Sequence, residues 1–272
     1  GVVGWMSDIS TVTKQEMIEY REKFYRPDNA TLVLAGDLEP VKVMALVTKY
    51  FGAIKAKGKS PRVRTEEPSP EYYRRTIGPN FKPPYIEKRV LGRAATNPQV
   101  TLMFHIPPLW HDDVPALTML GRVMSARTGK MYMDLVEKQQ HVTGVNTSAS
   151  NSMYDGSFRA SATGREVQGA LTVPLDQIEK ELWSYLEDAK TTPADAQLLQ
   201  RIKNSIEATY LQSLAGTGIA GSLASMEVAY KWQHLEDQFK ARMAVTPDDM
   251  MRVAKKYFTR DNCVTGVMER EK

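Results

Sequence analysis

An internal repeat constrains the fold of this chain more than any other sequence feature. Residues 13–29 and 246–262 lie 233 positions apart, align without a gap and share the identical pairs Thr13/Thr246, Met17/Met250, Lys23/Lys256, Asp28/Asp261 and Asn29/Asn262. Each copy reads as a capped amphipathic helix that leads through an aromatic pair and Asp-Asn into an apolar strand. The repeat therefore predicts two homologous helix-to-strand units. The alternative is a chance likeness, because many amphipathic helices share such a pattern.

The two copies differ in how much chain precedes them. Only twelve residues stand before the first copy, whereas more than 200 stand before the second. We therefore expect the second copy to close a domain contained in this sequence. We expect the first copy to be the tail of a domain that this sequence does not contain, which would make the chain a fragment of a longer protein.

Composition indicates a globular protein with a sizeable core. The chain has 272 residues, 42% hydrophobic and 25% charged, and no apolar run long enough to span a bilayer. Its start lacks a signal-peptide pattern, which says nothing about a longer parent protein. The single cysteine, Cys263, excludes an internal disulfide and a multi-cysteine zinc site. We expect it to be a buried, inert thiol in the last strand.

Positive charge is concentrated in one segment. The net charge is +4, but residues 55–93 alone hold eleven Lys or Arg against four Glu. Proline is frequent in this segment, where it fixes the backbone and removes hydrogen-bond donors, so we interpret residues 55–85 as a solvated linker between two lobes. Nucleic-acid binding is the alternative, but that function would place the charges on a helix face or groove with interleaved aromatic residues.

Periodicity and turn signals predict the order of the elements. The first copy predicts a helix with the capping box Thr13/Glu16, a strand over 30–38, and a second helix from Pro40 to Gly52. Further strands are predicted over 86–92, 99–106, 142–150 and 156–164, the last two as a hairpin. Further helices are predicted over 112–124, 130–138, 174–190, 198–210 and 222–231, with helix starts at the Thr-Pro pairs Thr192-Pro193 and Thr246-Pro247. This order predicts an α+β fold, a mixed and largely antiparallel sheet with helices on one face.

Three chemical motifs depend on their context for their meaning. Residues 216–221 spell GxGxxG, but a long helix leads into them, whereas a dinucleotide site needs a strand there, so we interpret them as a loop. The histidines are His105, His111, His141 and His234, and no two have the i,i+4 spacing of a helical zinc site. His105 and His111 could approach each other as metal ligands or could simply be hydrogen-bonded surface residues. The sequence contains no GxSxG, so no complete catalytic site is predicted.

Arg159 and Tyr154 are the candidate site residues. An arginine beside a tyrosine hydroxyl can polarise a carbonyl or clamp a peptide backbone, so this pair could assist catalysis by a partner lobe. The alternative is that Arg159 points outward from an alternating strand and that Tyr154 serves the hairpin turn.

Four stretches carry a family resemblance. They are GWMSDI at 4–9, FYRPDNATLVLAGDL at 24–38, PPLWHDDVPALTMLGRVMSA at 107–126 and the stretch from Met131 through GSFRASATG at 131–164. Together they resemble the pitrilysin/insulinase-type zinc metallopeptidases, including the mitochondrial processing peptidases. The resemblance implies LuxS/processing-peptidase-like domains, two of which face each other as a clamshell. It would make residues 1–54 the end of the first, catalytic-type domain, residues 55–85 the linker, and residues 86–272 the second, non-catalytic domain.

The resemblance also implies where the chemistry lies. The family holds zinc with an HxxEH helix of the first domain and a downstream glutamate. The corresponding helix here reads ALTMLGRVM and has neither histidine nor glutamate, so zinc is expected in the absent N-terminal domain and not in this chain. Some relatives use an arginine and a tyrosine of the second domain, but no tyrosine stands seven residues after Arg159. Arg159 and Tyr154 therefore stay candidates only.

The resemblance implies a function for the assembled protein. We expect the chain to be the C-terminal region of a zinc metalloendopeptidase, inactive alone, which encloses a peptide substrate. Its partner would be its own N-terminal domain or a homologous subunit, with no role for nucleic acid, and its location the bacterial periplasm or cell envelope. One alternative is a non-catalytic scaffold or partner subunit of the same family. Another is an unrelated α+β binding domain, which would require the repeat to be accidental.

Overall fold

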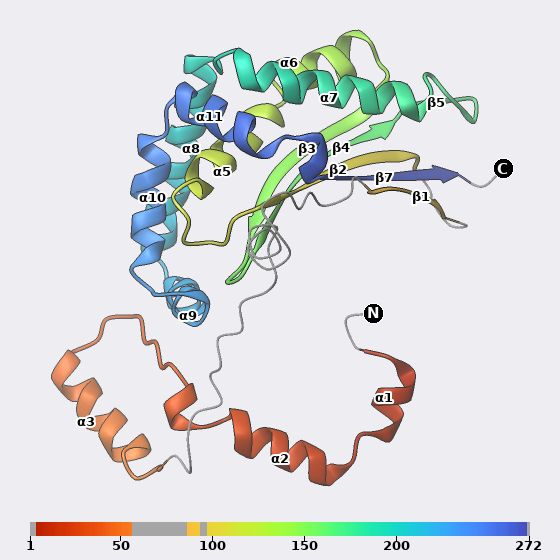
Figure 1. Ribbon diagram of the computed structural model, residues 1–272. Helices are drawn as coiled ribbons and strands as arrows, with labels where there is room; N and C mark the ends of the chain where they lie inside the picture. The colour runs from red at the N-terminus through yellow and green to blue at the C-terminus, as the bar shows by residue number, and fades with distance from the viewer. Residues whose placement is uncertain (1–3, 56–85, 93–96, 271–272) are drawn as a thin grey trace, which may run out of the picture.

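A five-stranded sheet organises the larger part of the molecule (Figure 1). The computed structural model describes residues 4–55, 86–92 and 97–270. The strands are β1 (Ile86–Gly92), β2 (Gln99–Ile106), β3 (Val142–Asn151), β4 (Gly156–Gly164) and β7 (Cys263–Arg270), in the order β1-β7-β2-β4-β3. Only β1 and β7 pair in parallel, and the other neighbours are antiparallel. A small hairpin of β5 (Glu166–Val167) and β6 (Ala170–Leu171) stands beside the sheet.

Helices cover one face of this sheet. They are α5 (Val114–Met124), α6 (Lys130–Tyr132) with the π-helical turn η2 (Met133–Lys138), α7 (Leu175–Thr191), α8 (Ala196–Leu214), α9 (Ile219–Ala229), α10 (His234–Ala244), α11 (Pro247–Tyr257) and the 3₁₀ turn η3 (Arg260–Asn262). The helices α5, α7 and α11 contact the strands, while α8 and α10 pack outside α5. This arrangement confirms the predicted α+β fold.

The core lies between the sheet and these helices because successive side chains of a strand point to opposite faces, and one of these faces is apolar. On β2, the residues Val100, Leu102, Phe104 and Ile106 are fully buried, while their neighbours in sequence are exposed or half-buried. The ring of Phe104 lies 5.0 Å from that of Phe258 and 5.5 Å from that of Trp183. Each such side chain contributes about 1.5–3 kcal/mol when it is buried. Cys263 is buried too, as predicted, and burial raises the pKa of its thiol to about 12.

The N-terminal elements have no share in this core. They are α1 (Met6–Thr11), α2 (Lys14–Phe24), the 3₁₀ turn η1 (Pro27–Asn29) and α3 (Pro40–Phe51), and none of residues 4–55 is buried. The predicted strand over 30–38 is wrong, since these residues belong to no sheet in the described part of the chain. A strand needs a neighbour to satisfy its backbone, and apolar alternation alone does not supply one. Apart from Lys55, the predicted linker over 55–85 lies outside the described residues.

Two other predictions need correction. Thr192 does not cap a helix but ends α7, and its hydroxyl donates to Asp188. The helix after it is capped by Asp195, whose carboxylate accepts from two backbone amides of the first turn at 2.7 and 3.0 Å. The helix α10 was missed because its fully buried positions are the polar residues His234 and Gln238, which hide the apolar period. No helix in the described ranges is long and apolar enough to cross a membrane.

Candidate functional site: the polar face of the sheet

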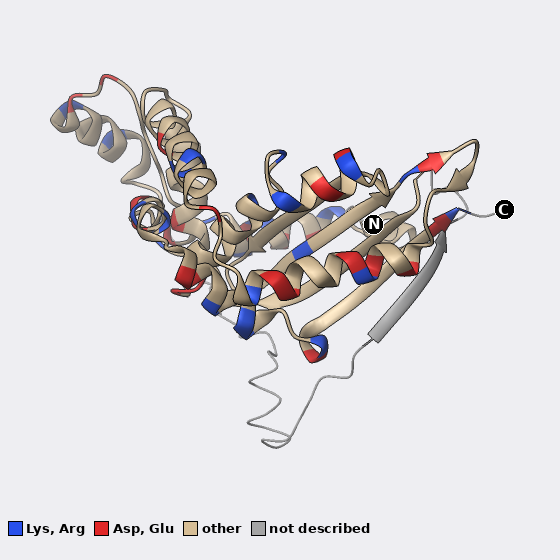
Figure 2. Cartoon of the chain, turned by 90° about the horizontal axis from the view of Figure 1, so that it is seen from above, with Lys and Arg blue, Asp and Glu red and all other residues tan. Residues whose placement is uncertain are grey.

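The face of the sheet away from the helix-covered core carries mostly small and polar residues on β2, β3 and β4, together with the exposed apolar side chains of Met103 on β2 and of Val264 and Met268 on β7. On β2 and β4 the residues of this polar face pair across the strands as Gln99/Thr163, Thr101/Ser161, Met103/Arg159 and His105/Ser157. Charged residues lie mostly on the helices and leave the strands largely uncharged (Figure 2). Arg159 is the single charged residue on β2, β3 and β4. The polar face therefore offers hydrogen-bonding groups around one cation.

Arg159 occupies a fixed place on this face. It is exposed, and its register partners are Met103 on β2 and Ser148 on β3. Its Nη2 donates to Gln99 Oε1 at 3.1 Å and approaches Thr101 Oγ1 at 3.5 Å. Both contacts use the same nitrogen, so within the described residues the rest of the guanidinium remains free to bind a carboxylate or a peptide carbonyl.

Tyr154 lies in the turn between β3 and β4, apart from Arg159. The turn is closed by the amide of Ser152, which donates to the carbonyl oxygen of Asp155 at 2.7 Å. Gly156 is required at its end because a Cβ there would lie 2.9 Å from the carbonyl oxygen of Pro107. Arg159 lies three positions after Gly156 along the strand, which is about 10 Å. Among the described residues no hydrogen bond joins Tyr154 to Arg159.

The histidines predicted as a possible pair have separate partners. His105 Nε2 lies 2.5 Å from the carboxylate of Asp155, at the end of the polar face. His111 Nδ1 instead accepts from the backbone amide of Asp113 at 3.0 Å. Within the described ranges, no three His, Cys, Asp or Glu side chains come together in a way that could hold a metal ion. Since α5 also carries neither histidine nor glutamate, the described residues do not fit a zinc site.

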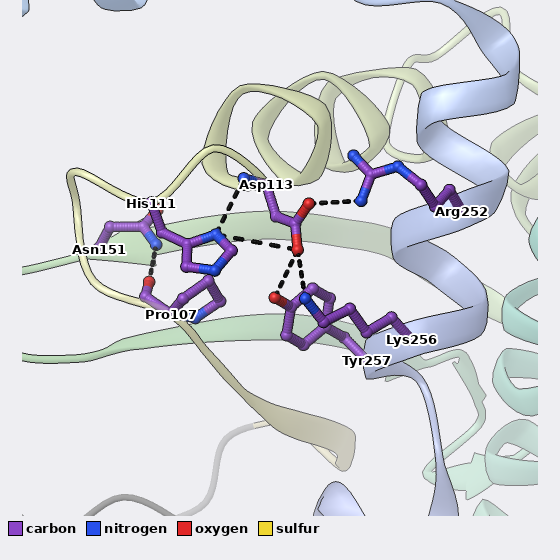
Figure 3. A network of polar contacts seen from close by, with 7 residues as sticks. All are labelled: Pro107, His111, Asp113, Asn151, Arg252, Lys256 and Tyr257. Carbon is purple, nitrogen blue, oxygen red and sulfur yellow. Dashed lines mark hydrogen bonds and ion pairs between the residues drawn. The ribbon is translucent and has the colours of Figure 1, made fainter. Parts of the chain in front are cut away.

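A polar network that was not predicted fixes α11 against the start of α5 (Figure 3). The buried carboxylate of Asp113 accepts from Arg252 Nη1 at 2.5 Å, from Tyr257 Oη at 2.7 Å and from Lys256 Nζ at 2.8 Å. The repeat contains one signal for it, because Lys256 is identical to Lys23 in the first copy. Asp113, the carboxylate partner of Lys256, lies about 140 residues away along the sequence. Local sequence patterns cannot pair residues at that separation.

The network changes the ionisation of its members. Burial opposes the charge on Asp113, but the hydrogen bonds from Lys256, Arg252 and Tyr257 outweigh it and hold the pKa of the carboxyl well below its usual range. Burial, and then the hydrogen bond to Asp113, raise the pKa of Tyr257 to about 12. The network is therefore an ion pair at neutral pH and has a structural role, on the helix side of the sheet.

Comparison with known proteins identifies the family. The chain belongs to the family described as the Peptidase M16 inactive domain, which matches residues 11–206. It is 24% identical over 260 residues to the zinc protease PqqE of Helicobacter pylori (strain ATCC 700392 / 26695). The aligned region covers 94% of this chain and 55% of that protein. These matches confirm the resemblance found in the sequence.

Solved structures show the same fold. The crystal structure of a protease from Helicobacter pylori has a TM-score of 0.80 at 22% identity and covers 98% of this chain and 62% of that one. The periplasmic protease PqqL from Escherichia coli has a TM-score of 0.70 at 13% identity and covers 99% of this chain and 30% of that one. The chain thus spans little more than half the length of the PqqE relative and under two thirds of these structures.

Proposed function

We propose that this chain is the C-terminal, non-catalytic half of a zinc-dependent endopeptidase. In this proposal residues 1–54 end a first, catalytic-type domain, residues 55–85 link the domains, and residues 86–272 form the second domain. Membership of a family described as an inactive peptidase domain supports it, as does the likeness to a protein named a zinc protease. Zinc would be held by the first domain, upstream of this chain.

The observation that carries the proposal is the polar face of the sheet. A solvated face is common in antiparallel sheets, but on this one Gln99 and Thr101 hold a single arginine in a fixed position. An extended peptide presents alternating carbonyls and amides, and the side chains of Gln99, Thr101 and Arg159 can bind them. The second domain would close this face over a substrate held against the first domain.

Arg159 is the residue proposed to touch the substrate. Its contact with Gln99 orients the guanidinium, whose free nitrogens would donate to a peptide carbonyl. Tyr154, in the turn after β3, would contribute only if the substrate extends along the strands to that end of the face. The two residues would then act at separate positions along one peptide, since they do not meet.

The partner and the location follow from the same proposal. The partner would be the protein's own N-terminal domain or a homologous subunit that supplies the zinc-binding helix. The location would be the bacterial periplasm or cell envelope, which is supported by the likeness to a protease from Escherichia coli that is called periplasmic.

The first experiment compares the full-length protein with this 272-residue chain. Zinc content and cleavage of a fluorogenic peptide library would be measured for both, with and without a chelator. We expect chelator-sensitive cleavage by the full-length protein and none by the chain. If the full-length protein is also metal-free and inactive, a scaffold or partner subunit is the correct interpretation. If the chain alone cleaves peptides or binds zinc, the proposal is wrong.

A second experiment tests Arg159 in the full-length protein. Loss of one charge-assisted hydrogen bond to substrate should raise KM by about tenfold or more in Arg159→Gln, with partial recovery in Arg159→Lys. Lys180→Gln, an exposed change on α7, is the matched control and should leave KM unaltered. Equal KM values for Arg159→Gln and the wild type would remove Arg159 from the site.

A further inference from the structure

A carboxylate lies at one end of the polar face without a cation beside it. Asp155, in the turn before β4, contacts the ring of His105 at 2.5 Å, and its Oδ1 accepts from the backbone amide of Gly156 at 2.6 Å. The side chains of Asp155 and His105 are 33% and 34% exposed. In the described part of the chain, no lysine or arginine contacts Asp155. A partly exposed carboxylate with these two contacts can accept from further donors.

His105 shows that this carboxylate belongs to the polar face. Its neighbours Phe104 and Ile106 are fully buried, so the ring of His105 projects from the face opposite the core. Its register partner on β4 is Ser157, another residue of the polar face. The carboxylate that contacts this ring therefore lies at the end of the same face that carries Arg159.

The two opposite charges of this face are too far apart to neutralise each other. The guanidinium of Arg159 lies 3.5 Å from Thr101 Oγ1, whereas the carboxylate of Asp155 contacts His105. Thr101 and His105 stand four positions apart on β2, which is about 13 Å. Salt screens exposed charges beyond about 8 Å at physiological ionic strength. Each charge is therefore available to a separate group of a ligand.

An extended peptide has the spacing that this pair of charges requires. Its side chains at alternate positions point to the same side, so residues four positions apart lie about 13 Å apart and face the same surface. A peptide that runs along β2 and β4 and presents a carboxylate to Arg159 would bring the residue four positions away to Asp155. A positively charged nitrogen at that residue would donate to the carboxylate.

We propose that Asp155, held by His105, binds a positively charged nitrogen of the peptide substrate, four positions from the residue at Arg159. This subsite rests on the proposed function and adds a substrate class to it, namely peptides with a cation at a defined distance from Arg159. A lysine or arginine side chain and a free N-terminus offer the same charged nitrogen. Asp155 would select the substrate and take no part in breaking the bond.

The alternatives are that Asp155 only stabilises the turn, or that it pairs with a lysine or arginine of the first domain. Asp155→Asn tests both, because an amide oxygen can still accept from Gly156 and from His105 while the negative charge is lost. In either alternative the variant would change stability at most, and the preference among substrates would stay as in the wild type.

The test measures KM and kcat of the full-length protein for fluorogenic peptides with a glutamate and a lysine four positions apart, in both orders. Peptides with glutamine in place of the lysine are the reference. We expect the lysine to lower KM by about fivefold with little change in kcat. The gain should vanish when the two charges stand three positions apart, because their side chains then point to opposite sides.

Variants assign this gain to the subsite. Asp155→Asn should remove it, whereas Asp112→Asn, the same change at an exposed residue before α5, should keep it. His105→Ala should reduce the gain and leave KM for the glutamine peptides unaltered, a pattern that a general loss of structure would not produce.

Peptides with free and acetylated N-termini distinguish the two sources of the charged nitrogen. A gain that survives acetylation supports a side chain as the ligand, and a gain that requires the free amine supports the N-terminus. Equal KM values for charged and neutral peptides would overturn this inference and leave the proposed function intact. Failure to cleave any peptide would instead refute the proposed function. Fluorescence anisotropy of the same peptides, labelled, would then decide the inference, and equal Kd values for the lysine and glutamine peptides would overturn it.

Discussion

The two copies of the repeat share their local structure but differ in what surrounds them. In both, a threonine begins the helix with a complete capping box. In both, an asparagine amide donates to a carbonyl oxygen at the end of the helix at 2.9 Å, Asn29 to Phe24 and Asn262 to Tyr257. The helix and the turn therefore depend on short-range sequence, and the same residues produce them twice.

The two copies differ in how far their side chains are buried and in whether their strands find neighbours. Met250 is 1% exposed and Phe258 is fully buried, whereas the aligned Met17 is 61% exposed and Tyr25 is 79% exposed. The strand β7 lies between β1 and β2, but the aligned residues 30–38 pair with no strand in the described ranges. The comparison shows that helices and turns are local structures, while strands and cores require partners from distant sequence.

The largest expected difference in stability between matched variants of the two copies concerns the aromatic residue after each helix. Phe258→Ala should lower the free energy of unfolding of the chain by about 3–5 kcal/mol, because the ring packs against Phe104 and Phe158. Tyr25→Ala should change it by less than about 0.5 kcal/mol, because the side chain is exposed. Denaturant unfolding followed by fluorescence measures both.

The same pair of variants sharpens the comparison in the full-length protein. If an upstream domain covers the first copy, Tyr25→Ala should there cost about as much as Phe258→Ala costs here. If Tyr25→Ala leaves the free energy of unfolding unchanged in both proteins, the first copy is not part of a packed domain. The repeat would then not mark two homologous domains.

A smaller difference concerns the lysine that the two copies share. In the second copy Lys256 contacts Asp113, which is only 5% exposed, and Asp113→Asn should cost about 2–4 kcal/mol at neutral pH. In the first copy Lys23 lies over the ring of Phe24 and has no carboxylate partner in the described part of the chain. Lys23→Gln should therefore leave stability close to that of the wild type.

The Asp113 contribution should depend on pH with a defined sign. The folded pKa of Asp113 lies below the unfolded value of about 3.9, so its contribution is fully present above pH of about 5 and is lost as the pH falls below that. Unfolding measured from pH 6 down to pH 3 should show a shallower loss in Asp113→Asn than in the wild type. Parallel curves would mean that another carboxylate dominates.

Most of the fold could be predicted from the sequence, because its signals are local. The strands β1, β2 and β4 occur at the predicted residues, and the capping box predicted the start of α2. The strand over 30–38 was wrongly predicted because the apolar run is genuine and only the neighbour is missing. The helix α10 was missed because its buried positions are polar.

The site was less predictable for a different reason. Alternation along β4 placed Arg159 on a face, and the structure shows which residues share that face: Gln99 and Thr101 lie about 60 residues away along the sequence. The predicted hairpin placed Tyr154 in the turn and Arg159 on the following strand, but it did not show which residues of β2 contact Arg159. Pairing across a sheet depends on which strands are neighbours, and the alternation along one strand does not reveal its neighbour.

Replacing the asparagine after each helix should lower the free energy of unfolding by different amounts. The expected difference is about the contribution of one hydrogen bond. Asn262 donates both to Tyr257 and to the carbonyl oxygen of His105 on β2, so Asn262→Ala should cost about 2 kcal/mol. Within the described ranges Asn29 donates to Phe24 alone, and water can replace that contact, so Asn29→Ala should have an effect of about 0.5 kcal/mol or less. Equal costs in denaturant unfolding would mean that the contact with β2 adds nothing.

The smallest effect tests whether the two helix caps are equivalent. Thr246→Ala should lower the free energy of unfolding by about 1 kcal/mol, because α11 is held in the core and the loss of its cap is felt globally. Thr13→Ala removes the same capping box from a short helix with no buried residue. Such a helix is marginal alone, so the change should raise amide exchange in α2 and leave global unfolding unaltered. Hydrogen exchange resolved by peptide separates the two responses, and a global effect of Thr13→Ala would show that α2 is coupled to the core after all.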